Sequence, residues 1–231
     1  MSLLVAVLDS GVQVANPHLA GASIRGFSLV GAAPPLQRHP DFSDGTGHGT
    51  AATAALLRLV PDASILAIRL LDADLRTTSA ALAAGIVAAA QEGATLINLS
   101  LGTRAEESRA LLSDAVAQAR ALGAICVASA HPRGAMLLPA DLPDVVSATT
   151  HRSCPLSELY TVEAPGPRFL AHGFPRPIEG RVATDNLFGP SFAAVHVTAR
   201  ALLLLREDPT LGFDGVVAGL RAAAIGAWSG T

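Results

Sequence analysis

Short apolar runs alternate along the chain with longer stretches that carry apolar residues at helical spacing. Unbroken apolar runs such as residues 3–8 and 124–130 are typical of strands buried on both faces of a parallel sheet. The same pattern predicts further strands over residues 63–71, 94–99 and 145–149. Helical spacing predicts helices over residues 51–59, 79–92, 105–122, 191–207 and 213–224.

Alternating strands and helices of this kind indicate a mostly parallel sheet with helices on both faces. Residues 32–44 are polar and carry prolines, so they are expected to form a surface loop. Residues 151–185 hold prolines throughout and are expected to be irregular with short edge strands. The sequence shows neither an internal repeat nor a linker, and we expect one domain over residues 1–231.

Composition and charge narrow the classes of function. Half of the 231 residues are hydrophobic (50%), enough for one sizeable core. The formal net charge is −3 and no basic cluster is present, which argues against a nucleic-acid partner. All 16 basic residues are arginines, and the absence of lysine excludes Schiff-base chemistry, a P-loop lysine and a Ser–Lys dyad.

The sequence also bears on localisation, disulfide formation and metal binding. No apolar run is long enough for a membrane span, and the first eight residues resemble a strand more than a signal peptide. We therefore expect a cytoplasmic protein with no membrane association. Cys126 and Cys154 support neither a disulfide framework nor a metal site, and we expect neither a metal nor a cofactor.

Ser191 stands at the start of a long helical stretch, directly after a glycine and a proline. One interpretation is a helix cap, for which serine is a favoured residue. The other is a nucleophile whose developing oxyanion is held by the first N–H groups of the helix. Because a serine alone is a weak nucleophile, the second interpretation requires a histidine and a carboxylate elsewhere.

Asp9 and His48 are candidates for these partners. Asp9 ends the first apolar run and would lie at the carboxyl end of a strand, where α/β sheets place functional groups, although it also suits a turn. His48 lies in the glycine-rich stretch 44–50 before a helix. A phosphate-binding loop is disfavoured here because no strand directly precedes it and lysine is absent, whereas a turn that presents His48, or an ordinary surface histidine, fits.

Five short motifs make the chain resemble the subtilisin-like (S8) serine peptidases, in which the catalytic order is Asp, His, Ser. The motifs are Val7-Leu8-Asp9-Ser10-Gly11-Val12, Gly47-His48-Gly49-Thr50, Ile97-Asn98-Leu99-Ser100-Leu101-Gly102, Ala164-Pro165-Gly166 and Gly189-Pro190-Ser191-Phe192-Ala193. The resemblance implies a three-layer α/β/α fold with a mostly parallel central sheet. It also implies acyl transfer, in which Ser191 attacks a peptide carbonyl, His48 moves the proton and Asp9 orients the imidazole.

The resemblance further implies where a peptide would bind. Its backbone would lie as an added strand along Ser100, Leu101 and Gly102. The opposite side of the primary specificity pocket would be formed by Ser129, Ala130 and His131. Leu137 is expected near the pocket floor, which favours a shallow pocket for small side chains.

Two departures from the family stand out. Pro132 occupies the position of the asparagine that donates to the oxyanion, so the Ser191 N–H would act with His131 as a substitute donor. We hypothesise an incomplete oxyanion hole and either slow turnover or a partner protein that completes the site. Residues 50–63 are also too few for the calcium-binding loop of the family, and no calcium site is expected there.

The sequence therefore favours a selective serine endopeptidase acting on a peptide or protein substrate. The lack of an N-terminal prodomain suggests an intracellular processing protease for precursor peptides, including modified ones. The alternative is a catalytically weak or inactive subtilisin-like domain that binds a peptide or partner protein. A third possibility, acyl transfer to an amine, has no specific support.

Overall fold

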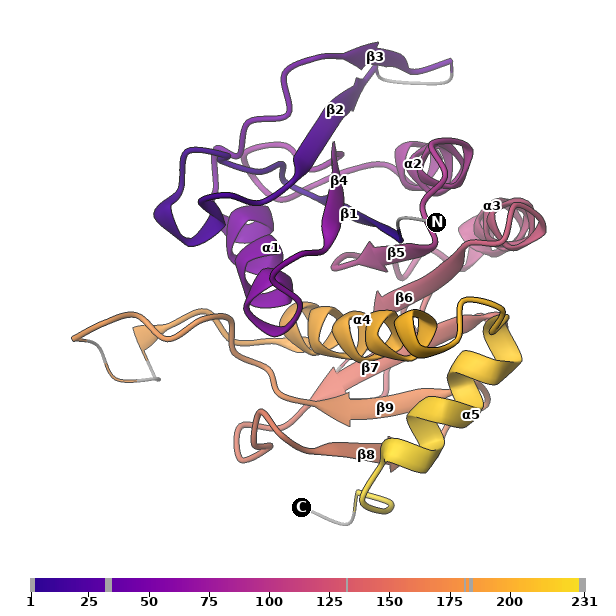
Figure 1. The fold of residues 1–231 in the computed structure, drawn as a ribbon. Helices are drawn as coiled ribbons and strands as arrows, with labels where there is room; N and C mark the ends of the chain where they lie inside the picture. The colour runs from indigo at the N-terminus through magenta and orange to yellow at the C-terminus, as the bar shows by residue number, and fades with distance from the viewer. Residues whose placement is uncertain (1–2, 32–34, 132, 181, 183–184, 229–231) are drawn as a thin grey trace.

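A nine-stranded sheet in the order β3-β2-β4-β1-β5-β6-β7-β9-β8 forms the centre of the molecule (Figure 1). The structure is a computed structural model that describes residues 3–31, 35–131, 133–180, 182 and 185–228. The strands are β1 Leu4–Asp9, β2 Ile24–Val30, β3 Gln37–His39, β4 Ser64–Arg69, β5 Leu96–Leu99, β6 Ile125–Ser129, β7 Val145–Thr150, β8 Leu159–Val162 and β9 Arg168–Ala171. Neighbours from β2 to β9 are parallel, and only the two edge strands, β3 and β8, pair antiparallel.

Helices cover both faces of this sheet, which confirms the predicted three-layer α/β/α fold (Figure 1). The helices are α1 His48–Leu59, α2 Ser79–Gln91, α3 Arg109–Ala121, α4 Pro190–Glu207 and α5 Phe213–Ala223, with short 3-10 turns η1 Pro17–Leu19 and η2 Glu106–Ser108. α2 and α3 pack together on one face, whereas α1, α4 and α5 lie on the other.

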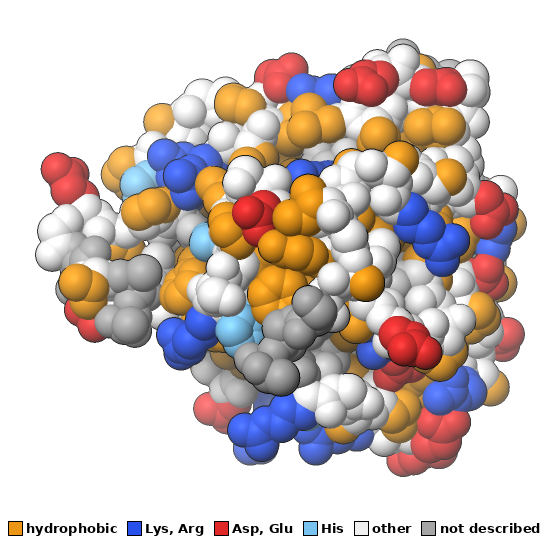
Figure 2. All heavy atoms as spheres, turned by 90° about the horizontal axis from the view of Figure 1, so that it is seen from below, with side chains coloured by type: hydrophobic (Ala, Val, Ile, Leu, Met, Phe, Trp, Pro, Cys, Tyr) orange, Lys and Arg blue, Asp and Glu red, His pale blue; other side chains and the backbone are white. Residues whose placement is uncertain are grey.

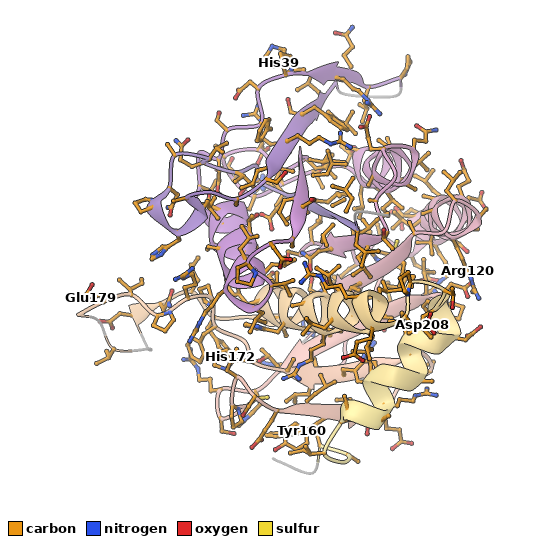
Figure 3. The ribbon with its side chains drawn as sticks, in the orientation of Figure 1. His39, Arg120, Tyr160, His172, Glu179 and Asp208 are labelled. Atoms are coloured by element: carbon orange, nitrogen blue, oxygen red, sulfur yellow. The ribbon has the colours of Figure 1, made fainter. Side chains whose placement is uncertain are left out.

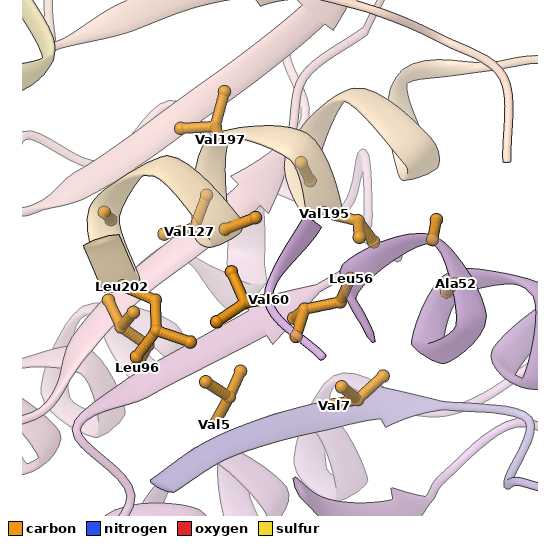
Figure 4. Close-up of a cluster of buried hydrophobic side chains, with 14 of the residues drawn as sticks. Val5, Val7, Ala52, Leu56, Val60, Leu96, Val127, Val195, Val197 and Leu202 are labelled. Atoms are coloured by element: carbon orange, nitrogen blue, oxygen red, sulfur yellow. The ribbon is translucent and has the colours of Figure 1, made fainter. Parts of the chain in front are cut away.

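Two separate hydrophobic cores result from the alternation of side chains along each strand. Val5 and Val7 of β1 point into the core beneath α1 and α4, which Figure 4 shows. Ala6 and Leu8 point into the core beneath α2 and α3. Burial on both faces explains why the central strands appear in the sequence as unbroken apolar runs.

The structure differs from the sequence prediction mainly at the edges of the sheet. β2 was not predicted, and β3 lies inside the stretch 32–44 that was expected to be a loop. All three residues of β3 are exposed, so no apolar signal marks that strand. Of the two strands found within 151–185, only β8 is an edge strand, because β9 pairs with both β7 and β8. The predicted helix over 105–122 begins with η2 and becomes α-helical only at Arg109.

The topology gathers the candidate residues at one edge of the sheet. Asp9 is the last residue of β1, and Ser100 and Ser129 lie at the carboxyl ends of β5 and β6. The first turns of α1 and α4 carry His48 and Ser191. Because carboxyl ends of parallel strands meet at the same edge, this edge is where an α/β sheet forms its site.

Candidate active site

Asp9 is held rigidly at the end of β1. The residue is only 1% exposed, and its backbone carbonyl accepts hydrogen bonds from the N–H groups of Leu70 and Leu71 at 2.9 and 3.2 Å. Its Oδ1 accepts the Ser10 N–H at 2.7 Å and lies 2.7 Å from Nδ1 of His48. Its Oδ2 is buried with no hydrogen-bond partner among the described residues.

Glycines allow the first turn of α1 to approach Asp9 closely. Gly47 precedes His48 and adopts a left-handed backbone conformation with φ of 84°, which glycine reaches without steric cost. At position 49, a Cβ atom would lie 2.2 Å from the Gly11 carbonyl oxygen and 3.0 Å from Cβ of Asp9. A side chain there would push the helix away, so glycine at this position permits the contact between His48 and Asp9.

Asp44 fixes the histidine loop, residues 44–47, which leads into His48 at the start of α1. Its Oδ1 accepts hydrogen bonds from the Ser10 hydroxyl and the Gly47 N–H, both at 2.9 Å. Its Oδ2 accepts the Thr50 hydroxyl at 2.6 Å and the Thr50 N–H at 2.9 Å. The Ser10 oxygen in turn accepts the Gly49 N–H at 3.0 Å, which joins the loop to the end of β1. Burial alone would raise the pKa of Asp44, but these hydrogen bonds outweigh it and lower the pKa.

The surroundings of His48 prepare its imidazole to take up a proton. Because the Asp9 carboxylate accepts, Nδ1 of His48 carries the proton and Nε2 of the neutral ring is left with a lone pair. Burial disfavours the imidazolium and would lower the pKa of His48. The hydrogen bond from His48 to Asp9 and the negative charges of Asp9 and Asp44 outweigh this effect and raise the pKa above its ordinary value.

Ser191 lies beside this pair, at the second residue of α4. Its hydroxyl donates to the Ser100 carbonyl at 3.1 Å, and the Ser100 hydroxyl donates to the Ser191 carbonyl at 3.2 Å. The His48 ring lies 5.5 Å from the ring of Phe192, measured between centroids, which places the imidazole next to the start of α4. No hydrogen bond between His48 and Ser191 occurs in the described part of the chain, so the serine hydroxyl here is turned toward β5.

A buried polar network attaches α4 to β5 behind Ser191. The Asn98 side-chain amide donates to the Ser100 hydroxyl at 2.9 Å, and the Thr198 hydroxyl donates to the Asn98 side-chain oxygen at 3.0 Å. Asn98 and Thr198 are both fully buried. The network therefore fixes the start of α4, and Ser191 with it, against the end of β5.

The predicted substrate-binding residues form two neighbouring segments at the same edge. Leu101 and Gly102 continue from Ser100, and a Cβ atom at Gly102 would lie 2.8 Å from Cγ of Leu137. Leu137 therefore lies directly against this segment. Thr103 and Leu138 exchange backbone hydrogen bonds of 2.8 Å, which hold the two stretches together.

The second segment begins at Ser129, the last residue of β6. Ser129 and Ala130 are buried, and Nε2 of His131 lies 2.6 Å from a terminal nitrogen of the Arg104 guanidinium. A guanidinium can only donate, so this nitrogen of His131 accepts and cannot donate to an oxyanion in this arrangement. Pro132, on which the prediction of an incomplete oxyanion hole depends, lies outside the described residues. No sequence signal marks Arg104, because only the folded chain brings it to His131.

Other potential chemistry is limited among the described residues. They contain no group of three or more histidine, cysteine or acidic side chains able to hold a metal ion. Burial raises the pKa of Cys126 to about 12 and that of Cys154 to about 11, so both thiols are poor nucleophiles. Within the same described ranges, no helix has the length and apolar character needed to cross a membrane. The face in Figure 2 intersperses basic, acidic and hydrophobic side chains.

Comparisons with known proteins identify the family. The model of the subtilase family (Peptidase_S8) matches residues 2–224. Thermitase from Thermoactinomyces vulgaris is 37% identical over 140 residues, which is 56% of this chain but only 47% of thermitase. Subtilisin BL from Lederbergia lenta is 30% identical over 220 residues, covering 89% of this chain and 77% of that protein.

Solved structures share the fold at low sequence identity. A lanthipeptide protease superposes with a TM-score of 0.75 at 21% identity, covering 94% of this chain and 78% of its own. A cold-adapted subtilisin-like serine proteinase gives a TM-score of 0.72 at 20% identity, covering 95% and 81%. The prenylagaramide maturation protease PagA gives 0.67 at 23% identity, covering 88% and 75%. The family match over almost the whole chain, on this fold, shows that the chain belongs to the subtilase family of subtilisin-like serine peptidases.

Proposed function

We propose that this chain is a serine endopeptidase in which Asp9, His48 and Ser191 form the catalytic triad. The observation that carries the proposal is the 2.7 Å hydrogen bond between Asp9 and His48, formed beside the helix start that bears Ser191. A buried carboxylate that fixes the tautomer of an imidazole next to a serine is the arrangement needed to activate that serine.

In the proposed reaction, Oγ of Ser191 bonds to the peptide carbonyl carbon while Nε2 of His48 takes the proton of the Ser191 hydroxyl. The imidazolium, stabilised by Asp9, then gives this proton to the leaving amine, and water releases the acyl group by the reverse sequence. For the attack of Ser191, the hydroxyl that now donates to Ser100 would have to turn toward His48 by rotation about the Cα–Cβ bond. The Ser191 N–H has no intrahelical acceptor in the first turn of α4 and suits the oxyanion.

The peptide would lie between the segment Ser100–Gly102 and the segment Ser129–His131. A cavity of about 610 Å³ next to the histidine loop gives room for the part of the substrate that leaves. Its lining includes Gly47 and Thr50, which flank His48 in the sequence, and Leu187, which lies shortly before Ser191. Backbone pairing along the first segment would hold the chain in an extended conformation.

The oxyanion hole is proposed to be incomplete. Pro132 cannot donate, and His131 is already engaged with Arg104. Pro132→Asn should raise turnover, since removal of one such donor from a subtilisin costs roughly 10²–10³ in kcat. Steady-state hydrolysis of a cleaved peptide tests this: a variant no faster than wild type would reject the hypothesis, as would equal acceleration by Pro132→Ala.

For the biological role, we propose the processing of precursor peptides. Two structural neighbours support this choice, since one is a lanthipeptide protease and the other a prenylagaramide maturation protease. The predicted cytoplasmic location and the involvement of a partner protein belong to the same proposal. The alternative is a peptide-binding domain of little or no activity, which is favoured by the Ser191 hydroxyl facing Ser100 instead of His48.

An active-site probe separates these two functions. A fluorophosphonate should label wild type and Ser113→Ala, whose serine is exposed on α3, but not Ser191→Ala. His48→Ala should slow labelling strongly because the serine loses its base. Peptide cleavage is measured independently, by mass spectrometry of a peptide mixture incubated with each protein. A folded wild type that is neither labelled nor cleaves peptides would favour the peptide-binding domain.

A further inference from the structure

One guanidinium connects the two segments between which the peptide is proposed to lie. Arg104 follows the segment Ser100–Gly102, and His131 ends the segment Ser129–His131. The Arg104 terminal nitrogen lies 2.6 Å from Nε2 of His131. Arg104 is exposed, so its remaining donors are accessible to a ligand.

In the described part of the chain, this guanidinium has no carboxylate partner. Arg109, the next arginine along the chain, is paired with Glu106. Arg168 is paired with Asp141 in the same part of the molecule. Among the described residues, no aspartate or glutamate lies within ion-pair distance of Arg104. Its one hydrogen bond there is to the ring nitrogen of His131, which leaves most of its five N–H donors unused.

The local charge points to an acidic ligand. Arg133, two residues beyond His131, is also exposed and has no ion-pair partner in the described part of the chain. The acidic residue nearest to Arg104 in the sequence, Glu106, is already paired with Arg109. The next one, Glu107, lies on the η2 turn and pairs with no arginine in the described part of the chain. A guanidinium presents parallel donors whose spacing matches a carboxylate, and such charge-assisted pairs are stronger than neutral hydrogen bonds.

From these contacts we infer that Arg104 is a specificity-determining residue that selects peptides with an aspartate or glutamate before the cleaved bond. The inference rests on the proposed function, because the acyl part of the substrate would lie along Ser100–Gly102. Arg104 stands two residues beyond Gly102, so the acidic side chain is placed in the part of the peptide that precedes the cleaved bond. A bound carboxylate would replace or share the His131 contact and complete the pairing of the guanidinium.

Binding of peptides to the Ser191→Ala variant tests the inference without requiring catalysis. The immobilised variant is exposed to a randomised octapeptide mixture with blocked ends, and the retained peptides are sequenced. We expect aspartate and glutamate to be enriched about tenfold over asparagine and glutamine at one position, as a single charge-assisted pair allows. Adding Arg104→Gln should abolish that enrichment, and Arg104→Glu should replace it with enrichment of lysine and arginine. Arg109→Gln, whose arginine is already paired with Glu106, is the matched control and should retain the acidic preference.

The retained peptides and the labelling of Ser191 decide separately on the role of Arg104 and on the proposed function. Equal retention of acids and amides, unchanged acidic enrichment in Arg104→Gln, or no retention above background would overturn the inference. Fluorophosphonate labelling of Ser191 in the otherwise unchanged protein reports on the proposed function separately. Acidic enrichment without labelling would leave Arg104 as a recognition residue in a non-catalytic domain, whereas labelling without enrichment would reject only the role of Arg104.

Discussion

One carboxylate, Asp44, both holds the histidine loop and contributes negative charge near the imidazole. Its two oxygens accept hydrogen bonds from the loop, from the first turn of α1 and from Ser10 at the end of β1. The same charge helps to raise the pKa of His48. Asp44 does not contact the proposed reacting atoms, so its role is to position His48 and to tune its proton affinity.

Asp44→Asn should therefore change the pH dependence of catalysis as well as its rate. Removing the charge lowers the pKa of His48, so the acid limb of kcat/KM, which reports protonation of the base in the free enzyme, should move to lower pH. The plateau should fall roughly tenfold, because an amide cannot accept at both positions. Asp41→Asn removes an exposed carboxylate just before this loop and should leave the limb in place. An unmoved limb in Asp44→Asn, or one moved to higher pH, would show that Asp44 has only a structural role.

At the level of elements, α4 depends on β5 for its position. The single hydroxyl proton of Thr198 is shared between the Asn98 side-chain oxygen and the Ala194 carbonyl, and the Asn98 amide donates in turn to the Ser100 hydroxyl. These groups are buried where water cannot replace a lost partner, so the network ties the start of α4, which bears the proposed nucleophile, to the end of β5, beside the proposed substrate-binding segment.

Thr198→Val keeps the shape of the side chain but leaves the Asn98 oxygen buried without a donor. We expect a loss of about 1–3 kcal/mol in the free energy of unfolding, the usual cost of an unpaired buried polar group. Thr53→Val on α1 is the matched control, because the Thr53 hydroxyl is buried with no partner among the described residues. That variant should be as stable as wild type or more so. Urea unfolding measures both, and equal effects of the two substitutions would contradict the importance of the network.

The same elements show what the sequence could and could not predict. Strands β1 and β6 are buried on both faces, so their apolar runs were recognisable, whereas β3 is exposed and forms only by pairing with β2. The motifs around Asp9, His48 and Ser191 identified candidate residues. The direction of the Ser191 hydroxyl and the contact between Arg104 and His131 depend on segments that are distant in sequence meeting in space, and local sequence does not encode them.

For the whole molecule, stability at low pH depends on a histidine outside the proposed chemistry. His196 of α4 is 2% exposed, and its Nε2 donates to the Phe174 carbonyl at 2.9 Å, while its Nδ1 has no partner among the described residues. The His172 ring packs against it at 5.3 Å between centroids, and Figure 3 shows His172 next to the first half of α4. Burial lowers the pKa of His196 to about 4; the hydrogen bond to Phe174 opposes this, and the charges of His172, Arg200 and Arg58 add to it.

His196 therefore makes the folded state lose stability on acidification. An unfolded chain binds a proton at this histidine near pH 6.5, while the folded chain resists it down to about pH 4. Between these values the unfolded state holds more protons, so the free energy of unfolding should fall by about 1.4 kcal/mol per pH unit from this group, roughly 3 kcal/mol in all. Urea unfolding at pH 7 and pH 4.5 measures the loss, and His196→Gln should show a loss smaller by most of that amount, whereas His39→Gln at an exposed site should behave as wild type. Because carboxylates titrate equally in all three proteins, the difference in this loss between the variants isolates the contribution of His196. An identical loss in His196→Gln would show that acid destabilises this fold through other groups.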